Sequence, residues 1–151
     1  MKRFRFPLQS VATVRAWHER DAREAFGAAM RAYTQAESRV QEERKLAQQT
    51  ESVLRAGRSK TFRPLEQAAF AAAYQTQLQV VRQVEQARVE AKTAVDRARD
   101  AWHAARSKLR AVEQLEHRAR QQHRVEQERA DQTAMDELAS IRATRSAQVL
   151  T

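Results

Sequence analysis

The stretch of sequence that decides the fold is Val81–Val112, which reads VRQVEQARVEAKTAVDRARDAWHAARSKLRAV. Alternating steps of three and four residues connect its seam positions, and it contains neither glycine nor proline. This heptad spacing over several turns is typical of a helix that packs lengthwise against another helix. The seam positions are Val81, Val84, Arg88, Ala91, Val95, Ala98, Trp102, Ala105, Leu109 and Val112.

An earlier stretch carries the same spacing and predicts the partner helix. Its members are Ala22, Phe26, Ala29, Tyr33, Ala36 and Val40, and Ala47 and Leu54 continue the frame, with Arg15 and Glu43 as interruptions. A short loop between two such helices makes them antiparallel neighbours. We therefore predict an all-α fold, a long two-helix antiparallel coiled-coil hairpin. The larger seam residues are Phe26, Tyr33, Val40, Val81, Val95, Trp102 and Leu109.

The few helix breakers predict where the helices end. Pro7 and Pro64 each precede a leucine, and proline is favoured at the first position of a helix. Gly57 follows a long helical stretch and suits the left-handed residue beyond a helix end. These residues predict a single coiled-coil domain over 1–151, with helix 1 at about 7–56, a loop at about 57–63 and helix 2 at about 64–146. Gly27 is expected inside helix 1, at a tolerant site.

The second helix is expected to outrun the first. Antiparallel pairing exhausts helix 1 near Val112, which leaves about thirty residues of helix 2 without a partner in the chain. This overhang is polar, but it ends with Met135, Leu138 and Ile141 at a spacing of three. Such a stripe is a candidate face for a partner. The alternative is that the overhang frays or self-associates.

The net charge of +9 is concentrated in two places. Lys2, Arg3 and Arg5 lie at the N-terminus, Arg58, Lys60 and Arg63 lie in the expected loop, and the helical stretches are nearly balanced. Basic clusters attract nucleic acid or acidic protein surfaces. A nucleic-acid partner is disfavoured, because no recognition motif is present and few aromatic residues accompany the basic ones.

The composition excludes most catalytic and metal chemistry. The chain has no cysteine for a disulfide or a thiolate site, and two glycines cannot build a phosphate-binding loop. None of the four histidines belongs to a metal-binding or di-iron motif. We therefore expect no enzyme activity, cofactor or metal. The longest apolar run, Ala68–Tyr74, is too short to cross a bilayer, and the N-terminus lacks a secretory signal.

Two terminal motifs resemble those of a known family. Phe4-Arg5-Phe6-Pro7-Leu8-Gln9 resembles the F-x-F-x-L-Q start of the flagellar export protein FliJ family. The stretch 131–139, DQTAMDELA, resembles the D-Q-x-x-M-D-E-hydrophobic-Ala stretch that closes the same family, and Trp102 also matches. The resemblance extends over the whole chain in length and hairpin layout.

This resemblance implies a cytoplasmic component of the flagellar type III export apparatus, peripheral at the cytoplasmic face of the inner membrane. Such proteins are similar to the two-helix stalk of the rotary ATP synthase γ subunit. The end with both termini is expected to enter the hexameric export ATPase, and the other end is expected to contact the membrane-embedded export gate. Export chaperones are further expected partners, and the free protein is expected to be a monomer.

The resemblance also supplies candidate contact residues. Those for the ATPase ring are Phe4, Phe6, Leu8, Met135, Leu138, Ile141 and Arg142, and those for the export gate are Phe70, Tyr74 and Leu78. Simple seam packing is the alternative for Tyr74 and Leu78. Three other functions stay open: the equivalent stalk of a virulence-type secretion system, a basic coiled coil that binds nucleic acid, and a structural coiled coil that dimerises through its overhang.

Overall fold

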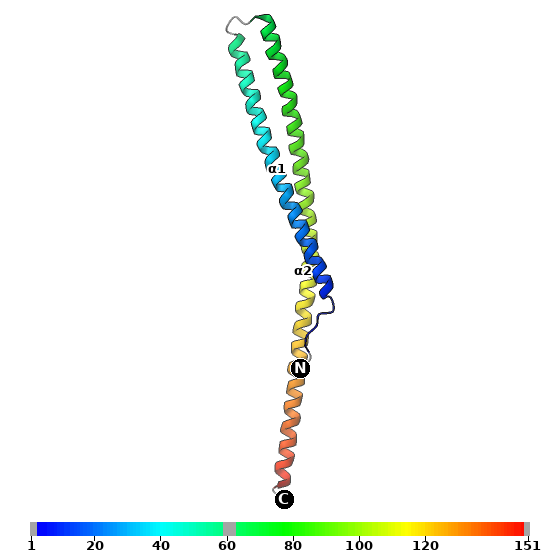
Figure 1. Ribbon diagram of the computed structural model, residues 1–151. Helices are drawn as coiled ribbons and strands as arrows, with labels where there is room; N and C mark the ends of the chain where they lie inside the picture. The colour runs from blue at the N-terminus through cyan, green and yellow to red at the C-terminus, as the bar shows by residue number, and fades with distance from the viewer. Residues whose placement is uncertain (1–2, 59–62, 150–151) are drawn as a thin grey trace. The chain divides into compact units, whose positions relative to one another are not determined.

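The chain folds into two long α-helices. The computed structural model describes residues 3–58 and 63–149, and within them α1 covers Gln9–Arg58 and α2 covers Pro64–Val149 (Figure 1). α1 has 50 residues and α2 has 86. The predicted fold class is confirmed, because the described residues are almost wholly helical, include no strand and form a second helix longer than the first.

The two helices begin differently around their prolines. Pro64 is the first residue of α2, and the carbonyl of Arg63 before it accepts hydrogen bonds from the N–H groups of Glu66 and Gln67 at 3.0 and 3.1 Å. Pro7 instead lies in a turn before α1, where the N–H of Gln9 donates to the carbonyl of Phe6 at 3.3 Å. The first proline therefore ends a non-helical segment rather than opening the helix.

The end of α1 differs from the prediction at Gly57. The helix continues through this residue to Arg58, and no described glycine has a positive φ. A glycine inside a helix costs only about 1 kcal/mol relative to alanine, so a long helix passes through it. The expected left-handed role of Gly57 is wrong. The centre of the expected loop, residues 59–62 with Lys60, lies outside the described residues.

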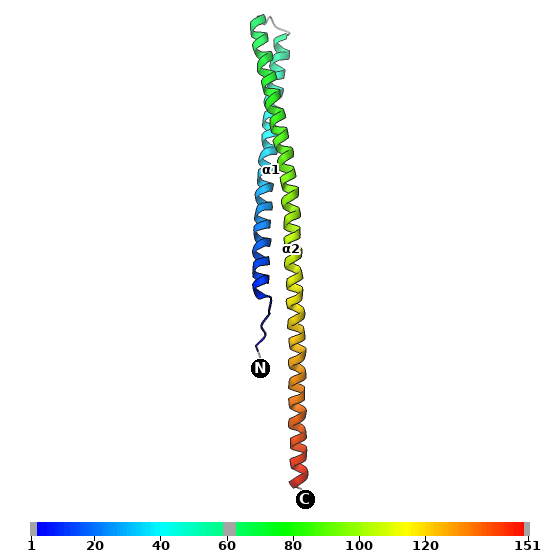
Figure 2. The ribbon, with the colours of Figure 1, turned by 90° about the vertical axis from the view of Figure 1, so that its right-hand side faces the viewer.

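The chain divides into two compact units. The hairpin unit is Glu19–Ala105, and the terminal unit combines Met1–His18 with Arg106–Thr151. Within the hairpin unit α1 and α2 run side by side in both ribbon views (Figures 1 and 2). No described helix is long and apolar enough to cross a membrane.

A thin apolar seam holds the hairpin unit together. Val40 is fully buried, Val95 is 4% exposed and Ala47 is 8% exposed. The larger side chains of the seam, Phe26, Tyr33, Val81 and Trp102, are half-buried. Two helices cannot enclose side chains of this size on all sides, so the core is one line of small and medium residues flanked by larger ones.

Polar contacts across the seam show that the helices are antiparallel. Arg88, inside the apolar frame, lies 4.0 Å from the carboxylate of Glu37. Glu43, which interrupts the apolar pattern of α1, accepts a hydrogen bond from Gln77 at 2.6 Å. A surface pair of this kind contributes about 0–1 kcal/mol to stability. These pairs mainly fix the register of the two helices, because a slip along the seam would leave both polar residues without these partners.

Candidate partner-binding surfaces

The non-helical N-terminal segment of the terminal unit packs on α2 through its two phenylalanines. Phe6 is only 7% exposed. Phe4 is half-buried, and its ring meets the ring of His123 edge-on with centroids 5.4 Å apart. The guanidinium of Arg120 lies 5.2 Å from the centre of the same ring. The phenylalanines therefore anchor this segment to one face of α2.

The extended form of this segment explains how far it reaches. Residues 3–6 precede the turn at Pro7 and Leu8. An extended residue advances about 3.3 Å and a helical residue 1.5 Å, so four extended residues span about nine helical ones. Beyond the buried Val112, α2 still has a half-buried residue every three or four positions. These residues are Glu116, Ala119, His123 and Gln127. The overhang without a partner was expected to begin just after Val112, and this was wrong, because the N-terminal segment packs on α2 as far as His123.

The next part of α2 is exposed. Every residue from 128 to 145 is exposed in the terminal unit, including Arg142. The stripe residues Met135, Leu138 and Ile141 are 65%, 53% and 51% exposed. The structure therefore separates the candidate ring contacts into two groups. Phe4 and Phe6 are packed, whereas the C-terminal stripe and Leu8, at 39%, are open to a partner.

An eleven-residue period connects the covered and the open parts of α2. Glu116, Gln127 and Leu138 are eleven residues apart, and so are Ala119, Ala130 and Ile141. Eleven residues make three helical turns at 3.67 residues per turn, close to the α-helical value, so such positions share one face. Leu138 and Ile141 thus continue the face on which the N-terminal segment packs. The seven-residue repeat of the seam, continued along α2, does not select Leu138 and Ile141.

An aromatic cluster in the hairpin unit surrounds Trp102. Its ring stacks on that of Phe26 at 5.6 Å with an interplanar angle of 11°, and the ring of His103 lies 5.3 Å away. The indole N–H donates a hydrogen bond to the carboxylate of Glu19 at 2.8 Å. A large half-buried side chain is thus satisfied at its polar end and packed at its apolar end. The cluster is part of the helix pairing.

Tyr33 forms a second polar cluster in the hairpin unit. A hydrogen bond to Glu37 raises the pKa of Tyr33 above its usual 10.0, and desolvation and the negative charge of Glu37 act in the same direction. The positive charge of Arg88 opposes these effects. The ammonium of Lys92 lies 5.8 Å from the centre of the ring. The hydroxyl group therefore donates within α1, and the contacts that reach α2 are those of Arg88 with Glu37 and of Lys92 with the Tyr33 ring.

The described residues offer no metal site, because they contain no group of three or more histidine, cysteine or acidic side chains placed to hold an ion.

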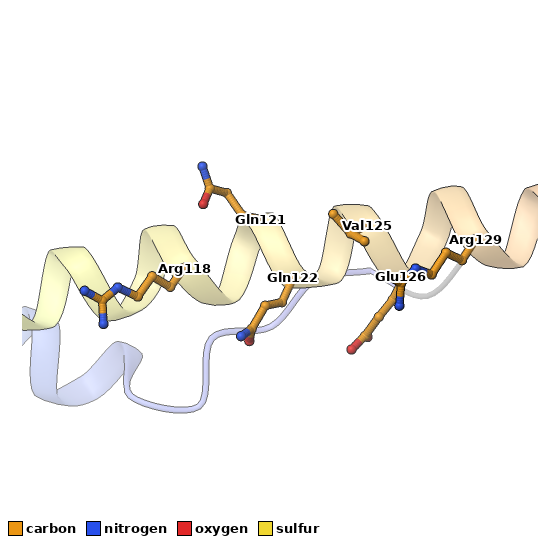
Figure 3. A pocket seen from close by; sticks show the side chains of 6 residues that line it. All are labelled: Arg118, Gln121, Gln122, Val125, Glu126 and Arg129. Atoms are coloured by element: carbon orange, nitrogen blue, oxygen red, sulfur yellow. The ribbon is translucent and has the colours of Figure 1, made fainter.

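A hollow in the terminal unit is lined by Arg118, Gln121, Gln122, Val125, Glu126 and Arg129 (Figure 3). In this view Gln122 and Glu126 point to the same side of α2 and Gln121 points away. All six lining residues belong to one helix, which is convex and cannot enclose a small molecule.

Comparison with known proteins agrees with this geometry. The family model described as flagellar FliJ protein matches residues 4–148, nearly the whole chain. The chain belongs to the FliJ family. Its membership makes it a protein of flagellar export. No curated protein and no solved structure matches the chain.

The gate candidates of this FliJ-family protein lie near the start of α2, in the hairpin unit. Phe70 is 39% exposed, and Tyr74 and Leu78 are half-buried. Steps of four residues put all three on one side of the helix. Phe70 is the most exposed of the three, so it presents more of its surface to a partner than the other two.

Sequence reasoning missed one surface of this FliJ-family chain. Val11, Val14 and Trp17, near the start of α1, are 39%, 47% and 61% exposed. Ala12, Arg15 and Ala16 on the same helix are half-buried and mark its packed side. Their three-residue spacing is visible in the sequence, but spacing alone does not show which side of a paired helix stays exposed.

Proposed function

We propose that this FliJ-family protein is a non-enzymatic stalk of the flagellar export ATPase, at the cytoplasmic face of the inner membrane. Its terminal unit enters the ATPase ring, and its hairpin unit contacts the export gate. The observation that carries this proposal is the open stripe of Met135, Leu138 and Ile141 on a helix whose residues are all exposed from 128 to 145. Three large apolar residues on one exposed helical stretch favour a partner.

The packing of the terminal unit gives the candidate ring contacts two different roles. Phe4 and Phe6 already pack on α2, so they support the helix rather than touch the ring. Leu8 and the stripe residues are exposed and contact the ring directly, together with the cationic Arg142. A supported helix loses less conformational freedom on binding, which favours association.

Contact with the export gate is assigned to Phe70, with Tyr74 and Leu78 beside it. Phe70 combines a large aromatic surface with 39% exposure, and aromatic anchors of this kind dominate many protein interfaces. Tyr74 and Leu78 are half-buried and fix the helix that presents Phe70. Export chaperones are further proposed partners of the chain.

The decisive experiment measures whether the full chain stimulates the ATPase. The chain is mixed with a flagellar export ATPase over a range of ratios, and ATP turnover and ring formation are followed together. The double variant Leu138→Ser with Ile141→Ser is expected to reduce stimulation about tenfold or more, because two apolar contacts are lost. Val89→Ser, which alters an exposed valine of the hairpin unit, is the matched control.

Two outcomes would overturn the stalk proposal. One is the absence of stimulation by the unaltered chain at every ratio. The other is equal stimulation by the double variant and the control variant. Sedimentation of the free chain accompanies the assay, since a stable dimer that Leu138→Ser dissolves would assign the stripe to self-association instead.

A further inference from the structure

An exposed apolar stripe at the start of α1 takes no part in the stalk proposal. It consists of Val11, Val14 and Trp17, and we name it the Trp17 stripe. Trp17 is 61% exposed and Val14 47% exposed. A helical residue turns about 100°, so Val14 and Trp17 point away from the side marked by the half-buried Ala12 and Ala16. The packing of α1 therefore leaves these two side chains on its outer face.

The part of the terminal unit that holds this stripe is strongly basic. Residues 3–18 and 106–118 together carry seven arginine and lysine side chains and only two acidic ones. The acidic residues are Glu113 and Glu116, and Glu116 forms a salt bridge of 2.7 Å with Arg120. No acidic residue occurs before Glu19. An occupant of the Trp17 stripe therefore meets a positive surface and is favoured if it is anionic.

The rest of the terminal unit is different. Residues 119–145 carry five basic and five acidic side chains, so the charge there is balanced. The C-terminal stripe around Leu138 belongs to this balanced part. The two exposed apolar stripes of the terminal unit thus differ in their electrostatic surroundings, which indicates occupants of different chemistry.

We propose that the Trp17 stripe is an interfacial contact for an anionic lipid bilayer. Helices that lie on membranes combine tryptophan and aliphatic residues on one face with arginine and lysine around them. Trp17, Val14 and Val11 provide the apolar face, and Arg3 and Arg5 are exposed basic residues of the same unit. Tryptophan also prefers the headgroup level of a bilayer, where its ring is buried and its N–H stays hydrated.

The position and composition of the stripe favour a bilayer. It lies on the exposed side of α1, and the hollow drawn in Figure 3 is lined by α2 residues alone. A tryptophan and two valines in a basic unit have the composition of a helix that lies on a membrane surface. Nucleic acid fits less well, because Val11 and Val14 offer it no polar contact. This lipid contact is independent of the ATPase stalk role and holds the protein at a membrane surface when the ring is absent.

The chain contains two tryptophans, which allows a clean spectroscopic test. The full-length Trp102→Phe variant leaves Trp17 as the sole tryptophan, and circular dichroism verifies that it stays helical. It is titrated with phosphatidylcholine vesicles that contain phosphatidylglycerol, and with vesicles of phosphatidylcholine alone. We expect a blue shift of Trp17 emission and co-flotation with the anionic vesicles. Binding should fall steeply as salt rises, because screening shortens the electrostatic range to about 10 Å at 0.1 M.

Variants in the same background assign the binding to the stripe. Trp17→Gln and Val14→Ser should each weaken flotation about tenfold, because each removes an apolar side chain from the interface. Arg3→Gln with Arg5→Gln should weaken it to a similar extent and reduce its salt dependence. Val89→Ser is the matched control, since Val89 is 52% exposed in the hairpin unit, and it should leave flotation unchanged.

Three results would overturn the lipid proposal. The first is no flotation of the chain with anionic vesicles at low salt. The second is equal flotation of Trp17→Gln and the Val89→Ser control. The third is a blue shift of Trp17 with the export ATPase but not with vesicles, which would assign the stripe to that protein. None of these results depends on whether Leu138 contacts the ATPase, so the two proposals fail separately.

Discussion

The ring of Phe4 meets the imidazole of His123 edge-on, with 5.4 Å between centroids. These two residues are far apart in sequence, and their contact shows that the N-terminal segment is part of the packing of α2. Phe6, at 7% exposure, anchors the same segment. A helix that was expected to stand alone is therefore supported over the stretch 112–127.

The first prediction concerns this support. Phe6→Ala should speed amide hydrogen exchange in residues 112–127 of α2 while leaving the exchange of the hairpin unit unchanged. Removing a buried phenyl group costs roughly 3 kcal/mol, and here the loss falls on a local contact rather than on the whole fold. Exchange followed by mass spectrometry of proteolytic peptides gives the readout. Arg5→Ala, which alters an exposed residue of the same segment, should behave as the unaltered chain.

The second prediction concerns the aromatic cluster of the hairpin unit. Phe26→Ala should lower the free energy of unfolding by about 2 kcal/mol, because it removes a half-buried ring stacked on Trp102. Glu19→Ala should cost about 1 kcal/mol, since it leaves the indole N–H without its acceptor. Urea denaturation followed by circular dichroism measures both. An unchanged midpoint for Phe26→Ala would show that the stack does not stabilise the helix pair.

The third prediction concerns the ionisation of Tyr33. The hydrogen bond with Glu37 raises its pKa above 10.0, so the folded chain holds this proton more tightly than the unfolded chain. The resulting stability is present in full below the unfolded pKa and is lost as the pH rises through the folded pKa. Ultraviolet absorbance of phenolate should show a late titration component that disappears in Tyr33→Phe.

Two charge variants should shift the pKa of Tyr33 in opposite directions. Glu37→Gln should move the Tyr33 pKa down towards its usual value, because the negative charge that raises it is gone. Arg88→Gln should move it further up, because the guanidinium favours the phenolate. A shift in the same direction for both variants would contradict the assignment of Glu37 and Arg88 as opposing neighbours.

The fold was predictable because heptad spacing reports directly on helix pairing. Val40 and Val95, which the seam frame selects, are among the most buried residues of the chain. The polar residues Arg88 and Glu43 in the seam frame are visible in the sequence. Their partners are not, since Glu37 and Gln77 lie on the other helix. The composition of a single helix does not determine which residue of its neighbour faces it.

The terminal unit was harder to predict for two physical reasons. The non-helical segment 3–8 has no periodicity, so its docking on α2 depends on a tertiary contact that local pattern does not encode. The face of α2 that it covers changes from a seven-residue to an eleven-residue repeat, and a fixed heptad frame drifts off it near Gln127. The Leu138 stripe was therefore found only as an isolated group, and its continuity with the covered face came from the structure.

The last prediction uses Gly27, which lies within α1 and has no positive φ. A Cβ built at this position meets only the guanidinium end of Arg31, at an ordinary contact distance of 3.5 Å. Gly27→Ala should therefore raise the free energy of unfolding by about 1 kcal/mol, because alanine loses less backbone entropy in a helix. Thermal denaturation should show a higher midpoint. Ala28 is the exposed neighbour of Gly27, and the opposite substitution there serves as a control. Ala28→Gly should lower the free energy of unfolding by a similar amount. A destabilised Gly27→Ala would mean that Arg31 cannot move aside and that this turn of α1 needs the space.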